Sequence, residues 1–156
     1  MKKIIYLLLL AGFIACNPNR IYKEYEGIPG MVWESDNKLK FEVEIEDTIS
    51  THKLIIAVRH ATYFSYSNLI INLTTTTPAG RQYEKKYELQ LKDENGDWKA
   101  LGAGDYWDIE IPVDKDIRFY ETGTYKFEIE QLVAKQLPMV MEIGLIIEKV
   151  DSSPDS

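Results

Sequence analysis

Cys16 is the only cysteine in this chain of 156 residues, and it directly follows a short apolar run. The run over residues 4–15 comes after two lysines and is about a dozen residues long, whereas a helix needs roughly 20 to span a bilayer. A basic start and a short apolar segment that ends in a small residue are the pattern of a cleaved secretory signal. Cleavage after Ala15 would make Cys16 the N-terminal residue, where its thiol can carry a thioether-linked diacylglycerol and its amine an acyl chain such as palmitate.

This pattern predicts a bacterial lipoprotein signal peptide over residues 1–15, followed by the acylated Cys16 and a tether over residues 16–30. Phe13 is a departure, because leucine is usual three residues before such a cysteine. No acidic cluster resembling a surface-export signal follows Cys16, which favours a periplasm-facing anchor in the cell membrane or the outer membrane. In the alternative interpretation the signal is cleaved in the ordinary way and Cys16 has no role.

Asp105 and Asp108 are the carboxylates most suggestive of acid–base chemistry, because aromatic residues flank them as in a sugar-processing cleft. Glycosidases, however, usually take their two carboxylates from separate elements that hold them at a set distance across the scissile bond. Two aspartates in one short segment are better explained as solvent-facing loop residues. We therefore expect no catalytic residues and no enzyme activity.

The two histidines, His52 and His60, lie near opposite ends of one predicted strand. At the rise of an extended chain they would be roughly 25 Å apart, too far to share a metal ion. The sequence has no glycine-rich phosphate loop, zinc-ligand spacing or Ser/His/Asp arrangement. Apart from the covalent lipid on Cys16, we expect no cofactor and no metal.

Charge and composition narrow the class of protein further. Removal of the signal would leave 16 Lys+Arg against 25 Asp+Glu, a net charge of −9. An acidic domain repels nucleic acid at long range, so we expect no nucleic-acid partner. Ten tyrosines and three tryptophans favour a β-rich protein over a helical one.

Trp98, Tyr106 and Trp107 form an aromatic group in a stretch that also contains two glycines. Their rings could stack on sugars, which makes a glycan-binding lipoprotein the alternative function. They could also close one end of the core, where they would bury a large apolar area. A docking patch for another protein is the third possibility.

Arg59, with Tyr63 and Tyr66 just beyond it, forms a second cluster. Arginine and tyrosine are enriched in the hot spots of protein interfaces, although an arginine over tyrosine rings can also be local packing. The candidate binding surface from the sequence is Arg59, Tyr63, Tyr66, Trp98, Asp105, Tyr106 and Trp107.

The elements that must position these residues are strands, because apolar and polar residues alternate with a period of two along most of the chain. Residues 39–46 and 125–130 alternate strictly and predict antiparallel strands with one wet face. The more continuously apolar segments predict inner strands over residues 53–59 and 68–74. Two further strands are expected over residues 81–91, with Tyr83, Tyr87, Leu89 and Leu91 pointing inward, and over residues 141–150.

Turn signals at residues 78–80, 93–96 and 121–123 divide these segments. The spacing predicts an all-β fold, an antiparallel β-sandwich of the jelly-roll or immunoglobulin-like kind with about seven to eight strands, over residues 31–150. Residues 97–120 are expected to be its least regular part. The tail over residues 151–156 is expected to be disordered.

A set of ordered landmarks runs through the whole mature chain. They are Cys16, Trp33, Phe41, residues 54–59, 63–68, 69–73 and 78–80, Leu91, Asp93, and residues 96–98, 101–104, 123–127 and 141–145. In these landmarks the chain resembles the gliding-motility lipoprotein family designated GldH, found in Bacteroidetes.

The resemblance implies a lipid-anchored protein of the cell envelope, associated with gliding motility and the linked type IX secretion apparatus. Its partners would be the membrane, through the lipid anchor, and envelope proteins of that complex. The family carries no catalytic residues that could be transferred to this chain. Its members also occur in Bacteroidetes that do not glide, so motility need not be the outcome.

Overall fold

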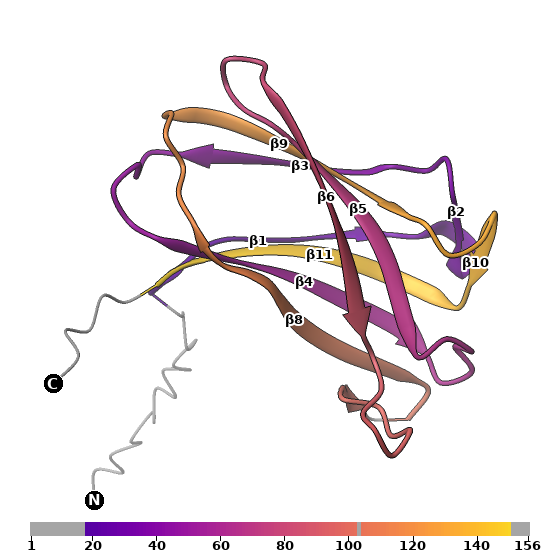
Figure 1. Ribbon diagram of the computed structural model, residues 1–156. Helices are drawn as coiled ribbons and strands as arrows, with labels where there is room; N and C mark the ends of the chain where they lie inside the picture. Colours follow the sequence, from indigo (N-terminus) through magenta and orange to yellow (C-terminus); the bar gives the residue numbers. More distant parts are fainter. Residues whose placement is uncertain (1–17, 103, 151–156) are drawn as a thin grey trace, which may run out of the picture.

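The computed structural model describes residues 18–102 and 104–150. Two antiparallel sheets, one of five strands and one of four, face each other across a common core (Figure 1). The predicted all-β antiparallel sandwich is confirmed. Cys16, the predicted signal over residues 1–15 and the predicted tail over residues 151–156 lie outside the described residues. Within the described segments, no helix has the length and apolarity needed to cross a membrane.

The strands follow one another in two main sheets and a small ribbon. The five-stranded sheet has the order β1 (Arg20–Gly27), β11 (Val140–Lys149), β4 (His52–Ala61), β8 (Tyr106–Ile117) and β7 (Leu101–Gly102). The four-stranded sheet has the order β3 (Leu39–Ile45), β9 (Gly123–Gln131), β5 (Asn68–Thr76) and β6 (Gln82–Gln90). The remaining elements are a ribbon of β2 (Val32–Glu34) with β10 (Gln136–Pro138), and the 3₁₀ helix η1 (Pro29–Met31). Eight strands have seven or more residues, in agreement with the prediction.

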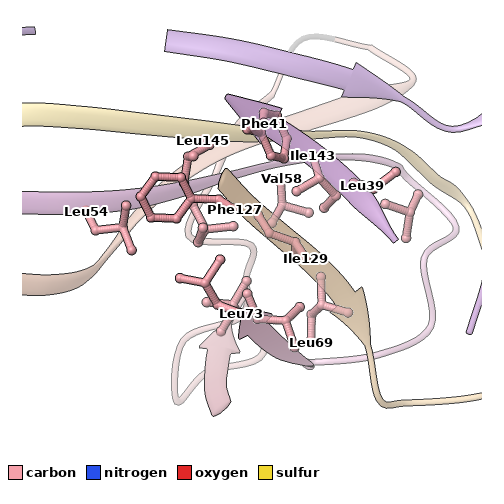
Figure 2. Close-up of a cluster of buried hydrophobic side chains, with 14 of the residues drawn as sticks. Leu39, Phe41, Leu54, Val58, Leu69, Leu73, Phe127, Ile129, Ile143 and Leu145 are labelled. Carbon is pink, nitrogen blue, oxygen red and sulfur yellow. The ribbon is translucent and has the colours of Figure 1, made fainter. Parts of the chain in front are cut away.

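The alternating pattern places one row of each strand in the core between the sheets. In β3 every second residue from Leu39 to Ile45 is buried, and the charged residues between them are exposed. Phe41 lies opposite Phe127 of β9 in the register, and Figure 2 shows side chains of the other sheet, including Leu145, beside Phe127. Burial of each such side chain contributes about 1.5–3 kcal/mol. The two sheets are therefore held together mainly by the apolar core.

The inner strands β4 and β11 are apolar on both faces. Ile55, Ala57 and Ile146 form a second buried cluster on the outer side of the five-stranded sheet. Long charged side chains surround this cluster, with Lys53 bound to Glu148 at 2.8 Å. The outer face of the five-stranded sheet therefore has a small buried apolar cluster with charged side chains around it.

The turn signals lie where the sequence predicts them. Gly80 has φ 82° between β5 and β6, and Gly96 has φ 84° in the turn after β6. The Asp93 side chain accepts hydrogen bonds from the backbone N–H of Asn95 and Asp97, both at 2.9 Å. Residues 93–96 form a turn because Gly96 adopts a left-handed backbone conformation and the Asp93 carboxylate accepts backbone hydrogen bonds.

The expectation of an irregular stretch over residues 97–120 is wrong for much of its length. β8 occupies twelve of these residues and pairs with β4 along its course. Pro112 obscures the strand pattern, since proline cannot donate a ladder hydrogen bond. It is tolerated because β8 lies at the sheet edge there, next to a register shift opposite Leu54 and Ile55.

The expectation of a tether over residues 16–30 also differs from the structure. Residues 20–27 form β1, which pairs with β11 as the edge of the five-stranded sheet. Six of its eight residues are exposed, so it lacks the apolar row that would mark it as a strand. The sandwich thus begins at residue 20, before the predicted boundary at residue 31.

Candidate functional site

The two predicted clusters meet at one end of the sandwich because β4 and β8 are neighbours (Figure 1). In the register, Arg59 stands opposite Asp108 and Ala61 opposite Tyr106. The loops that continue these strands also touch, since the Thr62 N–H donates to the Asp105 carbonyl at 3.0 Å. Segments more than 40 residues apart in sequence therefore contribute to one surface.

Arg59 is held by three hydrogen bonds to two carboxylates. Its Nε and Nη2 donate to the two carboxylate oxygens of Asp108 at 2.7 and 3.1 Å, and its Nη1 donates to Glu142 at 2.6 Å. The Tyr106 ring lies 5.3 Å from the guanidinium carbon. The Asp108 hydrogen bond raises the pKa of Arg59, against the opposing effect of burial. Bonds to charged partners in a fork geometry fix the orientation of the guanidinium plane.

Exposed aromatic residues lie beside this arginine. Tyr63 is 84% exposed and Tyr106 is 43% exposed, and Asp105 is exposed between them in the adjoining loop. We call Arg59, Tyr63, Asp105, Tyr106, Asp108 and Glu142 the β4–β8 surface. Next to it is a hollow of about 570 Å³ whose lining includes Arg59, Tyr25 and Lys99.

Three other predicted residues have a larger structural role. Trp98 is half-buried and packs on the core, with its ring centroid 4.3 Å from that of His60. Trp107 is also half-buried, and a methyl group at Gly102 would overlap its ring. The Tyr66 ring leans on the buried Phe64 at 5.6 Å. The aromatic group thus divides between packing residues and the more exposed tyrosines of the β4–β8 surface.

Both histidines are buried, one at each end of β4. His52 packs edge-on against Phe119 at 5.1 Å, and His60 Nδ1 is 2.9 Å from the Ala61 carbonyl oxygen. Burial lowers the pKa of each imidazole from its ordinary 6.5. In the described part of the chain, no group of three His, Cys, Asp or Glu side chains is arranged to hold a metal.

The two aspartates considered for acid–base chemistry have different surroundings. Asp108 has both oxygens engaged by Arg59, whereas the Asp105 side chain is exposed. A shared role in proton transfer would require both to face one reacting group.

Glu142 belongs to this surface, and sequence reasoning missed it. It lies in β11, 83 residues from Arg59, and is brought opposite Arg59 by the β11–β4 register. Its only local signal is a charge between apolar neighbours, Met141 and Ile143, in a strand that alternates imperfectly. Only the strand order could have joined it to Arg59.

Comparisons with known proteins agree with these features. A model of the GldH lipoprotein family matches residues 20–147, the span of the sandwich. The chain is 28% identical over 156 residues to a protein of Christiangramia forsetii named "Gliding motility lipoprotein GldH homolog", and the match covers 95% of each chain.

A solved structure of TmCBM61 in complex with β-1,4-galactotriose is a distant neighbour. It has a TM-score of 0.34 and 14% identity, over 83% of this chain and 88% of that one. A likeness at this level carries no argument about ligands. The family match extends over most of the chain, and we conclude that the protein belongs to the GldH lipoprotein family.

Proposed function

We propose that this protein is a non-enzymatic component of the gliding-motility and type IX secretion machinery. It is anchored by lipid on Cys16 in the cell membrane or outer membrane, faces the periplasm, and binds envelope proteins through the β4–β8 surface. The family match and the sequence pattern around Cys16 support the anchor and the setting. The geometry around Arg59 supports the choice of surface.

The observation that carries this choice is the pre-organised arginine. Asp108 and Glu142 come from the strands on either side of β4, so Arg59 is already ordered before a partner arrives. An ordered side chain loses less conformational freedom on binding, which leaves more of the interaction energy for affinity. Tyr63 and Tyr106 supply exposed aromatic area of the kind found at interface hot spots.

Site-specific photo-crosslinking in native membranes tests the proposal. A photoreactive phenylalanine analogue replaces Tyr63 or Tyr106 in the full-length chain, and the adducts are identified by mass spectrometry. Both positions should capture the same small set of envelope proteins. Ile49, which is 88% exposed in the turn between β3 and β4, provides the matched control and should capture none of this set.

The proposal is contradicted if neither the Tyr63 nor the Tyr106 position forms crosslinks. It is also contradicted if the Ile49 position captures the same proteins as the two tyrosine positions. An Arg59→Ala variant sharpens the result. It should reduce capture of the partner set at Tyr106, and the Ile49 position should still capture none of that set.

The glycan-binding hypothesis for Trp98, Tyr106 and Trp107 gains no support from the geometry. Two of the three rings are half-buried, and Trp98 packs against His60. Tryptophan fluorescence titrated with envelope polysaccharides tests it separately, since stacking on a sugar would change the emission.

A further inference from the structure

A cleft of about 440 Å³ opens between the two sheets along the side where β6 and β8 face each other. β6 is the last strand of its sheet, and beyond β8 lies only the two-residue β7, so within residues 18–102 and 104–150 most of this side has no covering strand (Figure 1). The volume is in the range of sites that hold small molecules, about 300–1,000 Å³. No residue of the β4–β8 surface lines the cleft, which makes it a separate feature.

The floor of the cleft is apolar. Leu54 comes from the five-stranded sheet, Leu73 and Phe127 come from the four-stranded sheet, and all three are buried core residues. At one end the Phe119 and Tyr125 rings meet edge-on with centroids 4.9 Å apart. A floor of this kind favours a hydrocarbon chain over a sugar, because polar groups placed against it would lose their hydrogen bonds to water.

Aromatic residues flank the mouth of the cleft. The sequence predicts that Tyr83 and Tyr87 point inward, and both line the cleft. Tyr83 is nevertheless 57% exposed, because none of the described strands lies beyond β6. Tyr120 stands in the opposite wall and is also exposed. These rings extend the apolar floor outward to solvent.

Positive charge gathers at the same mouth. Arg81, Lys85 and Arg118 line it together with two acids, Asp114 and Glu121. Lys85 pairs with Asp114 at 2.8 Å across the two sheets, and Arg81 pairs with Glu121. Arg118 is exposed and makes no ion pair with any residue that the structure describes. A mouth with an excess of cations is the charge complement of an anion, and it stands out in a chain of net charge −7.

We propose that this cleft binds a single-chain anionic amphiphile, a fatty-acid carboxylate. The hydrocarbon chain lies on the floor formed by Leu54, Leu73 and Phe127. The carboxylate lies at the mouth, where Arg118 binds it; Lys85 and Arg81 are paired with Asp114 and Glu121. Association is driven by removal of the apolar floor and of the hydrocarbon chain from water. The carboxylate head group sets the orientation of the fatty acid in the cleft.

A diazirine derivative of laurate is the probe for the test. The full-length acylated protein is placed in phosphatidylcholine nanodiscs, irradiated with the probe, and digested for peptide mapping by mass spectrometry. Label should fall on the peptides that contain residues 73–87 and 114–127. Unlabelled laurate should compete for it. Dodecyltrimethylammonium has a hydrocarbon chain of similar length and the opposite charge, and it should compete about two- to fivefold less well, the range expected for one exposed charge pair.

Two variants with matched controls make the test specific. Thr75→Trp puts an indole into the cleft and should lower labelling about tenfold or more by occupying its volume. Thr76→Trp places the same ring at the adjacent strand position, which does not line the cleft, and should leave labelling unchanged. Arg118→Glu should weaken laurate competition about two- to fivefold, as for an exposed ion pair, while Lys115→Glu, the same change outside the lining, should not.

Circular dichroism of each variant establishes that the sandwich is intact. The Arg118 side chain is exposed, so Arg118→Glu leaves the core untouched. The proposal is overturned by label outside the two cleft peptides, by equal competition from the cationic amphiphile, or by a folded Thr75→Trp protein that labels normally. None of these results bears on the crosslinks expected at Tyr63 and Tyr106.

Discussion

Arg59 shows how a single residue can link three strands on the outer face of a sheet. Its side chain contacts Asp108 of β8 and Glu142 of β11, and these strands lie on either side of β4. Without the guanidinium the two carboxylates would stand near each other with no cation between them, which disfavours the folded arrangement. The pair geometry is better than that of an ordinary surface ion pair, because Arg59 binds Asp108 with two nitrogens.

We expect Arg59→Ala to lower the free energy of unfolding by about 1 kcal/mol, since the three side chains are all partly exposed to solvent. Arg59→Lys should recover part of this loss but not the crosslinks at Tyr106, because an ammonium cannot reproduce the fork. Urea denaturation measures the effect. Lys40→Ala, which breaks a longer pair of 3.7 Å made by a far more exposed cation with Glu128, is the control and should change stability little. A destabilisation by Lys40→Ala equal to that of Arg59→Ala would contradict this account.

The buried histidines predict a pH dependence of stability at the residue scale. Burial lowers the pKa of His52 and His60 from 6.5, so below that pH the unfolded chain takes up protons that the folded protein does not. The free energy of unfolding should therefore fall as the pH drops from 7 through 6.5 toward the lowered pKa values. Urea unfolding at a series of pH values measures this slope.

The double variant His52→Phe, His60→Phe should flatten the slope between pH 7 and about pH 5. Carboxylates act in a different window. The hydrogen bond from Lys85 lowers the pKa of Asp114 from 3.8, so its contribution is lost only at more acidic pH. An unchanged slope in the double variant would show that other groups cause it.

At the scale of elements, the edge strand β1 is attached by close packing as well as by its ladder with β11. Gly144 of β11 lies opposite Tyr25 of β1 and Ala57 of β4 in the register. A Cβ at this position would stand 2.7 Å from the Tyr25 ring and 3.0 Å from the Ala57 methyl group. The glycine therefore allows the Tyr25 ring to approach the β11 backbone closely.

We expect Gly144→Val to destabilise the protein by about 1–3 kcal/mol, the usual effect of overpacking. The displaced Tyr25 should also make β1 exchange its amide hydrogens faster, which hydrogen-exchange mass spectrometry over residues 20–27 can follow. Gly27→Val is the control, since nothing lies within 4 Å of a Cβ there. Equal exchange in the two variants would rule out the proposed contact.

At the scale of the whole molecule, the N-terminal anchor and the sandwich are separated by very few residues. Cys16 is four positions before Arg20, the first residue of β1. At about 3.3–3.6 Å for each extended residue, a connection of this length keeps Arg20, the start of β1, within roughly 15 Å of Cys16. If Cys16 is acylated as proposed, the end of the sandwich where β1 begins lies close to the membrane, and Arg59 lies toward the other end of β4.

We expect Cys16→Ala to abolish palmitate labelling and to leave an uncleaved precursor. Globomycin, which inhibits the lipoprotein signal peptidase, should make the unaltered chain accumulate as an uncleaved precursor that still carries lipid on Cys16, whereas the Cys16→Ala precursor carries none. Metabolic labelling and immunoblotting of cell fractions measure both results. Normal maturation in the presence of globomycin would refute the lipid anchor, and Arg59→Ala, which should mature normally, serves as the control.

Much of the fold could be predicted because the period-two pattern is a local property of each strand. β3 and β9 alternate cleanly, and the turns at Gly80 and Gly96 carry their own conformational signal. β1 and β8 could not be assigned in the same way. One is a polar edge strand, and the other contains Pro112, so in each case the partner strand, not the local pattern, determines the conformation.

The sequence by itself determined the alternating strands, the acidic charge and the residue types from which a binding surface could be made, because these depend on composition and on neighbours along the chain. The tertiary structure decided which of those residues meet. Strand order placed Arg59 between Asp108 and Glu142, turned Trp98 toward the core, and left the β6–β8 side open above Leu73 and Phe127. The physical reason is that side-chain contacts across a sheet depend on register between distant strands, which no local pattern encodes.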